Sequence, residues 1–168
     1  MSVPIEDLVW GDPDSDRIRN IKITYAVVYL GRYDLTSEEE VGSHLAVDIK
    51  IPLGTPLRSI ANGRVSKISL GSAGFGHHVV IEHPNVPDPK NPGRTTTLYS
   101  SYSHMDLVNV VEGQTVIKGE RIGTSGSTGT ATTPHVHFQL DIADAPWHPY
   151  WPFTSAEASA SGLFFLRR

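Results

Sequence analysis

The sequence contains no cysteine among its 168 residues. This absence excludes disulfide bonds, thiolate ligands for a metal and catalysis by a thiol. A chain without cysteine can persist in an oxidising or a reducing compartment, so this feature does not indicate where the protein acts.

Long apolar runs are missing as well. No stretch reaches the roughly 18 apolar residues that a membrane-spanning helix needs. The first residues, MSVPIEDLVWGDPDSD, lack the basic end and the apolar run of a signal peptide. The sequence therefore predicts no membrane span in this chain. It indicates either a protein that stays inside the cell or a chain trimmed from a longer protein.

Positive charge is not concentrated anywhere in the chain. There are 14 Lys and Arg residues against 18 Asp and Glu, which gives a formal net charge of -4, and no basic run is present. Proteins that bind nucleic acids neutralise phosphates with clustered Lys and Arg. Nucleic acid is therefore not an expected partner.

The chain is rich in residues that make turns. Fifteen Gly and twelve Pro residues separate short runs in which apolar and polar side chains alternate, and this pattern is typical of strands joined by tight turns. We predict an all-β fold. The expected strands comprise residues 21–31, 44–51, 77–83, 95–105 and 132–141.

The turns and the domain organisation are predicted from local composition. Asn62-Gly63 is the best signal for a two-residue hairpin, and the proline-rich stretch 84–94 is expected to be a loop. We expect a lead segment with a first strand at 1–35, a core at 36–153 and a tail at 154–168. The sequence PWHPYWPF, at the end of the core, is interpreted as a lid over the core or as a wall that faces a substrate.

The stretch TTPHVHFQLD places two histidines in an apparent strand. Residues two apart in a strand project from the same face, so His135 and His137 should lie together while Val136 and Phe138 face the core. Two imidazoles so placed can share a site in which one binds a metal and the other reaches the water on that metal. Solvent-facing histidines are the simpler alternative for this motif alone.

Two further histidines have neighbours that suggest chemistry. His44 and Asp48 are four residues apart, and a straight strand would separate them by about 13 Å, so sharing an ion requires a bend. His104, in SYSHMD, suits proton transfer because the ordinary pKa of histidine is about 6.5. The remaining histidines have no useful spacing and are interpreted as structural: His77, His78, His83 and His148.

The joint pattern resembles the lysostaphin-type, or LytM-type, zinc endopeptidase domain. It runs from about residue 44 to 140 through HLAVD, GTPLRSIANGRV, GHHVVIEH, YSSYSHM, VVEGQTVIKGERIGTSGSTGT and PHVHFQL. The resemblance implies small antiparallel sheets with short hairpins, which form a barrel-sandwich core with an open groove. It also implies a hydrolase that cleaves peptide bonds in peptidoglycan, in cross-links or stem peptides.

The resemblance further implies the roles of five residues. One Zn²⁺ ion would be bound by His44, Asp48 and His137, with water at the fourth position, while His104 and His135 would act as catalytic residues. It places the protein in the cell envelope or outside the cell, with peptidoglycan peptide as its partner, and a monomer is the default expectation.

Two other functions were weighed. A non-catalytic LytM-type domain could bind cell-wall peptide or activate a partner amidase, but such relatives typically lack a metal ligand. A phosphocarrier with two adjacent histidines would not need Asp48.

The sequence departs from the usual family pattern at two places. Ala46 stands where HxxxD motifs commonly carry Gly, and the loop at 84–94 is longer than usual. A separate hypothesis concerns latency: oxygen-bearing side chains upstream of His44 could supply the fourth zinc ligand. The candidates are Asp12, Asp14, Asn20, Glu38, Glu39 and Glu40.

Overall fold

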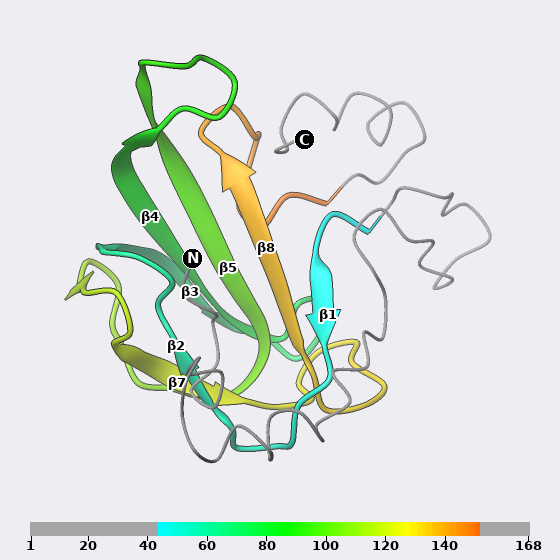
Figure 1. The fold of residues 1–168 in the computed structure, drawn as a ribbon. Helices are drawn as coiled ribbons and strands as arrows, with labels where there is room; N and C mark the ends of the chain where they lie inside the picture. Colours follow the sequence, from blue (N-terminus) through cyan, green and yellow to red (C-terminus); the bar gives the residue numbers. More distant parts are fainter. Residues whose placement is uncertain (1–43, 152–168) are drawn as a thin grey trace, which may run out of the picture.

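The computed structural model describes residues 44–151, and every strand in this range is antiparallel to its neighbours (Figure 1). The strands are β1 Val47–Ile49, β2 Pro56–Arg58, β3 Gly63–Leu70, β4 His77–Pro87, β5 Thr95–Val108, β6 Thr115–Val116, β7 Arg121–Ser125 and β8 Val136–Ile142. No helix occurs within 44–151, so the described range has no helix that could cross a membrane. The predicted all-β, LytM-type fold is confirmed.

The strands form one open, hydrogen-bonded network. Its main path has the order β1-β8-β5-β4-β3-β6, and β2 joins it by pairing with β7, which pairs with β5. Figure 1 shows β4, β5, β8 and β1 side by side, with the β2–β7 pair across the lower end of β5. The expected strand at 21–31, the tail from residue 154 and both predicted domain boundaries lie outside the described residues.

Strand β5 changes its partner in the middle. It pairs with β8 up to Ser103 and with β7 from Met105 onward. His104, between them, has a φ of 61°. A positive φ is uncommon for a residue other than glycine and costs about 1–3 kcal/mol. The sheet therefore bends at a candidate catalytic residue.

The main hydrophobic core lies between the two parts of the bent sheet. Its buried members are Ile49, Ile51, Leu57, Val65, Val79, Ile81, Tyr102, Met105, Val110, Val116, Ile122 and Val136. Tyr102 is fully buried, and its hydroxyl oxygen accepts a hydrogen bond from Ile60 N–H at 3.0 Å. Burial raises the pKa of Tyr102 to about 12. The Tyr102 side chain therefore packs in the core.

The hairpin predicted at Asn62-Gly63 is wrong. Strand β2 pairs with β7, whereas β3 pairs with β4 and β6, and neither Asn62 nor Gly63 has the positive φ of a type I′ turn. Gly63 is needed for a different reason. A Cβ atom at this position would lie 2.3 Å from the Glu82 carbonyl oxygen and 2.7 Å from His83 Nδ1.

The proline-rich loop is shorter than predicted. Strand β4 continues to Pro87, with Val86 paired to Thr96 and Pro87 to Thr95. Strand β3 pairs with β4 only as far as Glu82, so this end of β4 is hydrogen-bonded on one side alone. A proline is tolerated on the open side of a strand because its missing N–H removes no ladder bond.

Two other predicted strands are confirmed with changed ends. The 95–105 strand is the first part of β5, and the 132–141 strand corresponds to β8, which begins at Val136. The 44–51 strand shrinks to Val47–Ile49, because the chain before it bends back toward β1.

His83 links β4 to the segment before β3. Its Nδ1–H donates to the Asn62 carbonyl oxygen at 2.8 Å, and its Nε2 lies 2.7 Å from Ser100 Oγ. A carbonyl oxygen can only accept, so in the neutral ring Nε2 must accept from the serine hydroxyl. Burial lowers the pKa of His83 below its ordinary value. The folded chain therefore favours neutral His83.

We predict that protonation of this histidine contributes to acid destabilisation. Below the unfolded-state pKa of about 6.5, the unfolded chain binds more protons than the folded chain, so the free energy of unfolding should fall as the pH decreases. In His83→Gln, which retains a donor and an acceptor, the fall from about pH 7.5 to about pH 5.5 should be smaller. Urea unfolding of both proteins measures it, and an equal fall would contradict the prediction.

Candidate metal centre

The register between β1 and β8 creates the centre of the site. Asp48 lies directly opposite His137 in this antiparallel pair, so both side chains project from the same face of the sheet. His44 precedes β1, and its ring returns to the Asp48 carboxylate, with Nε2 at 3.2 Å from Oδ1. The bend that the sequence required between His44 and Asp48 is present.

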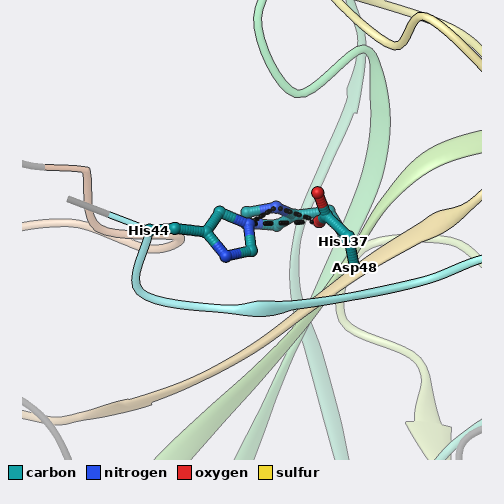
Figure 2. Close-up of side chains that lie close together, drawn as sticks. All are labelled: His44, Asp48 and His137. Carbon is teal, nitrogen blue, oxygen red and sulfur yellow. Dashed lines mark hydrogen bonds and ion pairs between the residues drawn. The ribbon is translucent and has the colours of Figure 1, made fainter. Parts of the chain in front are cut away.

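Three ligand-type atoms converge in this centre (Figure 2). His137 Nδ1 lies 3.0 Å from Asp48 Oδ1 and 3.3 Å from His44 Nε2. Zinc bonds of about 2.0–2.1 Å in a tetrahedron separate neighbouring ligand atoms by roughly 3.3 Å. The observed triangle has nearly these dimensions. The donor set of two imidazoles and one carboxylate therefore fits a zinc ion with one open position.

The electrostatics of the centre also suit a cation. His44, Asp48 and His137 are all at most 3% exposed. Burial alone would raise the pKa of the Asp48 carboxyl, but the neighbouring imidazoles of His137 and His44 favour its ionised form and hold the pKa well below its usual range. A buried carboxylate beside nitrogen lone pairs is the type of site that binds a metal.

His104 and His135 lie beside this triangle with similar hydrogen bonds. His104 Nδ1 is 2.8 Å from the Thr128 carbonyl oxygen, and His135 Nδ1 is 2.7 Å from that of Thr133. Because a carbonyl oxygen only accepts, each Nδ1 must carry the hydrogen, and in the neutral rings each Nε2 has a lone pair. The two ring centroids are 4.6 Å apart, and His135 Nε2 lies 3.7 Å from Asp48 Oδ2.

Burial determines the charge of His104. It lowers the pKa of His104 to about 4, against a smaller opposing effect of the hydrogen bond to Thr128. The ring is therefore neutral near pH 7 and able to accept a proton.

Two loops hold His104 in place. The backbone N–H of His104 donates to the Phe75 carbonyl oxygen at 2.9 Å. The Phe75 loop is joined to the Thr128 loop, since Thr130 N–H donates to the Gly74 carbonyl oxygen at 2.9 Å. At Gly129, where φ is 73°, a Cβ atom would lie 2.3 Å from that same oxygen. The loops therefore interlock through close backbone contact.

The segment interpreted as a lid or a wall has both features in its described part. Tyr150 is buried and forms a small core with Leu45 and Ala145. The Trp151 ring lies 6.2 Å from the His44 ring and 6.0 Å from the Phe75 ring, measured between centroids. The segment thus packs on the fold and also borders the metal centre.

The remaining histidines do not join the metal triangle. His78 Nδ1–H donates to the Gly76 carbonyl oxygen at 3.1 Å, and His77 Nδ1 lies 3.3 Å from the Asp106 carbonyl oxygen. His148 Nδ1 is 3.2 Å from Asp141 Oδ2. The acidic residues of the latency hypothesis lie outside the described range.

Sequence reasoning missed Gln139 and Asp141. Gln139 contacts His137 and Asp141, and both missed residues are at most 1% exposed. A signal was present: polar residues occupy every second position from His135 to Asp141 in a strand whose other residues are apolar. This alternation places all four polar side chains on the face that carries the metal centre.

The family follows from the match of the chain to known proteins. Residues 42–149 match the family model of Peptidase family M23. The chain belongs to this family. The resemblance to the lysostaphin-type domain is thereby confirmed, and the match covers both histidine motifs and the isolated His104 of this M23 domain.

Similar proteins are named as peptidases. Peptidoglycan DD-endopeptidase ShyA from Vibrio cholerae is 33% identical over 108 residues, which cover 64% of this chain and 22% of ShyA. The solved catalytic domain of lysostaphin from Staphylococcus simulans has a TM-score of 0.56 and 28% identity, covering 76% of this chain and 85% of that domain. A zinc-containing peptidase from Vibrio cholerae has a TM-score of 0.57 and 27% identity, covering 71% of this chain and 33% of that protein.

The matches cover a small part of the longer relatives. This chain spans about a fifth of the length of the curated relatives that it matches most strongly.

The interlocked loops generate a stability prediction with a matched control. Gly129→Ala introduces a close contact with Gly74 in addition to backbone strain, whereas Gly93→Ala, at a φ of 85° with no atom within 4 Å, introduces strain alone. We expect Gly129→Ala to lower the free energy of unfolding by about 1–3 kcal/mol more than Gly93→Ala. Urea unfolding measures this difference, and equal losses would show that the loops separate without cost.

Proposed function

We propose that this M23 domain is a zinc-dependent endopeptidase that hydrolyses peptide bonds in peptidoglycan, in cross-links or in stem peptides. The observation that carries the proposal is the buried triangle of His44, Asp48 and His137, with His104 and His135 beside it. The name of ShyA and the zinc reported in a structural neighbour support the same substrate class and metal.

The three residues of the triangle would hold the metal. A zinc ion bound there supplies a Lewis acid that polarises the scissile carbonyl and lowers the pKa of water at its open position. Asp48 provides the negative charge that offsets part of the charge of the ion, and two imidazoles complete the set. The rigid pairing of β1 with β8 keeps Asp48 and His137 in place before the ion arrives.

His104 and His135 would move the protons. Each neutral ring has an Nε2 lone pair that can take a proton from the attacking water, since its Nδ1–H donates to a backbone carbonyl. The imidazolium that results has an Nε2–H, which can stabilise the developing oxyanion or return the proton to the leaving amine. The backbone hydrogen bonds keep both rings oriented through these steps.

A non-catalytic domain that binds cell-wall peptide or activates a partner amidase is the second candidate. Its relatives typically lack a metal ligand, whereas this chain has the whole triangle and both additional histidines. The geometry therefore favours the enzyme. Because peptidoglycan lies outside the cytoplasmic membrane, we also propose that the protein acts in the cell envelope or outside the cell.

The first prediction concerns the metal and the reaction together. The purified protein should contain one zinc ion per chain by elemental analysis. It should also release new amino groups from purified peptidoglycan, and a chelator should stop this release while added zinc restores it. Zinc without any release of amines would favour the binding domain, and an absence of zinc would contradict both the proposed metal and the proposed mechanism.

The second prediction separates the residues that bind the metal from those that move protons. Asp48→Ala and His137→Ala should lose both zinc and activity, because each removes a ligand. His104→Ala and His135→Ala should retain zinc and lose about 10²- to 10⁴-fold in rate. Zinc content and the initial rate of amine release are measured on the same samples. Equal zinc loss in all four variants would show that these roles are misassigned.

A further inference from the structure

We propose that Gln139 is a positioning residue that orients the His137 ring, so that its Nδ1 atom faces the metal. The inference rests on the proposed zinc site and concerns how the chain prepares that site. Gln139 lies two residues after His137 on β8, on the same face of the sheet, and is 1% exposed. Its Oε1 is 3.2 Å from His137 Nε2.

The orientation of the Gln139 amide is determined by its surroundings. Its Nε2 donates to Asp141 Oδ1 at 2.7 Å and to the Tyr150 carbonyl oxygen at 2.7 Å. Both partners are oxygen acceptors, because a carbonyl cannot donate and the carboxylate lacks a hydrogen. A flipped amide would direct its oxygen at two other oxygens and lose both bonds. The amide oxygen must therefore face His137.

This orientation assigns the hydrogen on the His137 ring. An amide oxygen only accepts, so the hydrogen bond requires that His137 Nε2 carry a hydrogen. In the neutral ring Nδ1 then has the lone pair, and Nδ1 is the atom that lies 3.0 Å from Asp48 Oδ1 and 3.3 Å from His44 Nε2. Gln139 thus selects the form of His137 that can act as a metal ligand.

Gln139 is itself fixed by the segment that follows β8. Asp141 is fully buried, and its Oδ2 accepts from Tyr150 N–H at 3.1 Å and lies 3.2 Å from His148 Nδ1. The His148 ring stacks on Tyr99 of β5 with centroids 3.8 Å apart. A continuous series of hydrogen bonds therefore runs from His148 and Tyr150, through Asp141 and Gln139, to His137.

Such outer contacts influence how tightly a metal is held. A ligating histidine usually donates its second N–H to an oxygen acceptor, and loss of that acceptor typically weakens metal binding by about 10- to 100-fold. Gln139 supplies this acceptor for His137. His44 and Asp48 do not contact Gln139 in any hydrogen bond among the described residues, so the effect of Gln139 passes through His137.

The test compares three full-length proteins. Gln139→Met has a similar length but no acceptor. The double variant Gln139→Glu with Asp141→Asn keeps an acceptor toward His137 and restores a donor between positions 139 and 141. The control, Gln114→Met, removes an amide whose partners are Val111 N–H and Glu120 on a distant turn.

Zinc affinity is measured by competition with a chromophoric chelator. The zinc dissociation constant should rise about 10- to 100-fold in Gln139→Met, recover substantially in the double variant and match wild type in Gln114→Met. NMR at saturating zinc provides a second measurement. The Nε2–H signal of His137 should be downfield and slow to exchange in wild type, and it should move upfield and exchange faster in Gln139→Met.

The outcomes separate this inference from the proposed function. Wild-type protein that binds no zinc would overturn the proposed function and the inference together. Zinc binding by wild type with an unchanged dissociation constant and an unchanged His137 signal in Gln139→Met would overturn the inference alone. A lower melting temperature with both measurements unchanged would also overturn it, because it would reveal a purely structural role.

Discussion

The site depends on one pairing, that of Asp48 with His137 across strands β1 and β8. This contact brings residues 89 positions apart in the chain to 3.0 Å and directs them to the same side of the sheet. The bend before β1 then adds His44, and the strand before it adds His135. Because strand side chains alternate between faces, a one-residue slip of β8 would replace His137 by an apolar side chain and turn the polar row into the core.

The second constraint is the bend of β5 at His104. The strand pairs with β8 on one side of this residue and with β7 on the other, so His104 belongs to neither regular segment. Its backbone carries a positive φ, and its N–H finds the Phe75 carbonyl oxygen in a loop. The bend that encloses the core is therefore the same feature that brings His104 to the metal centre.

The sequence predicts the parts of this protein that depend on local pattern. Alternation identified the strands that became β5 and β8, and the HxxxD and HxH motifs identified the metal triangle. Asn62-Gly63 misled because a hairpin dipeptide was judged without knowing that Gly63 lies against β4. Gln139 was missed because its role depends on the Tyr150 carbonyl oxygen, and no side-chain pattern in the sequence reports where a backbone oxygen will lie.

The hydrogen bonds that orient His104 and His135 end on main-chain carbonyl oxygens of Thr128 and Thr133. Every amino acid has such an oxygen, so substitution of these two threonine side chains leaves the acceptors in place as long as the loop keeps its path. The loops beside the metal can thus diverge in sequence, and with it in the peptides that they contact, while the proton-transfer groups keep their orientation. Conservation of chemistry and variation of specificity are compatible within the same few residues.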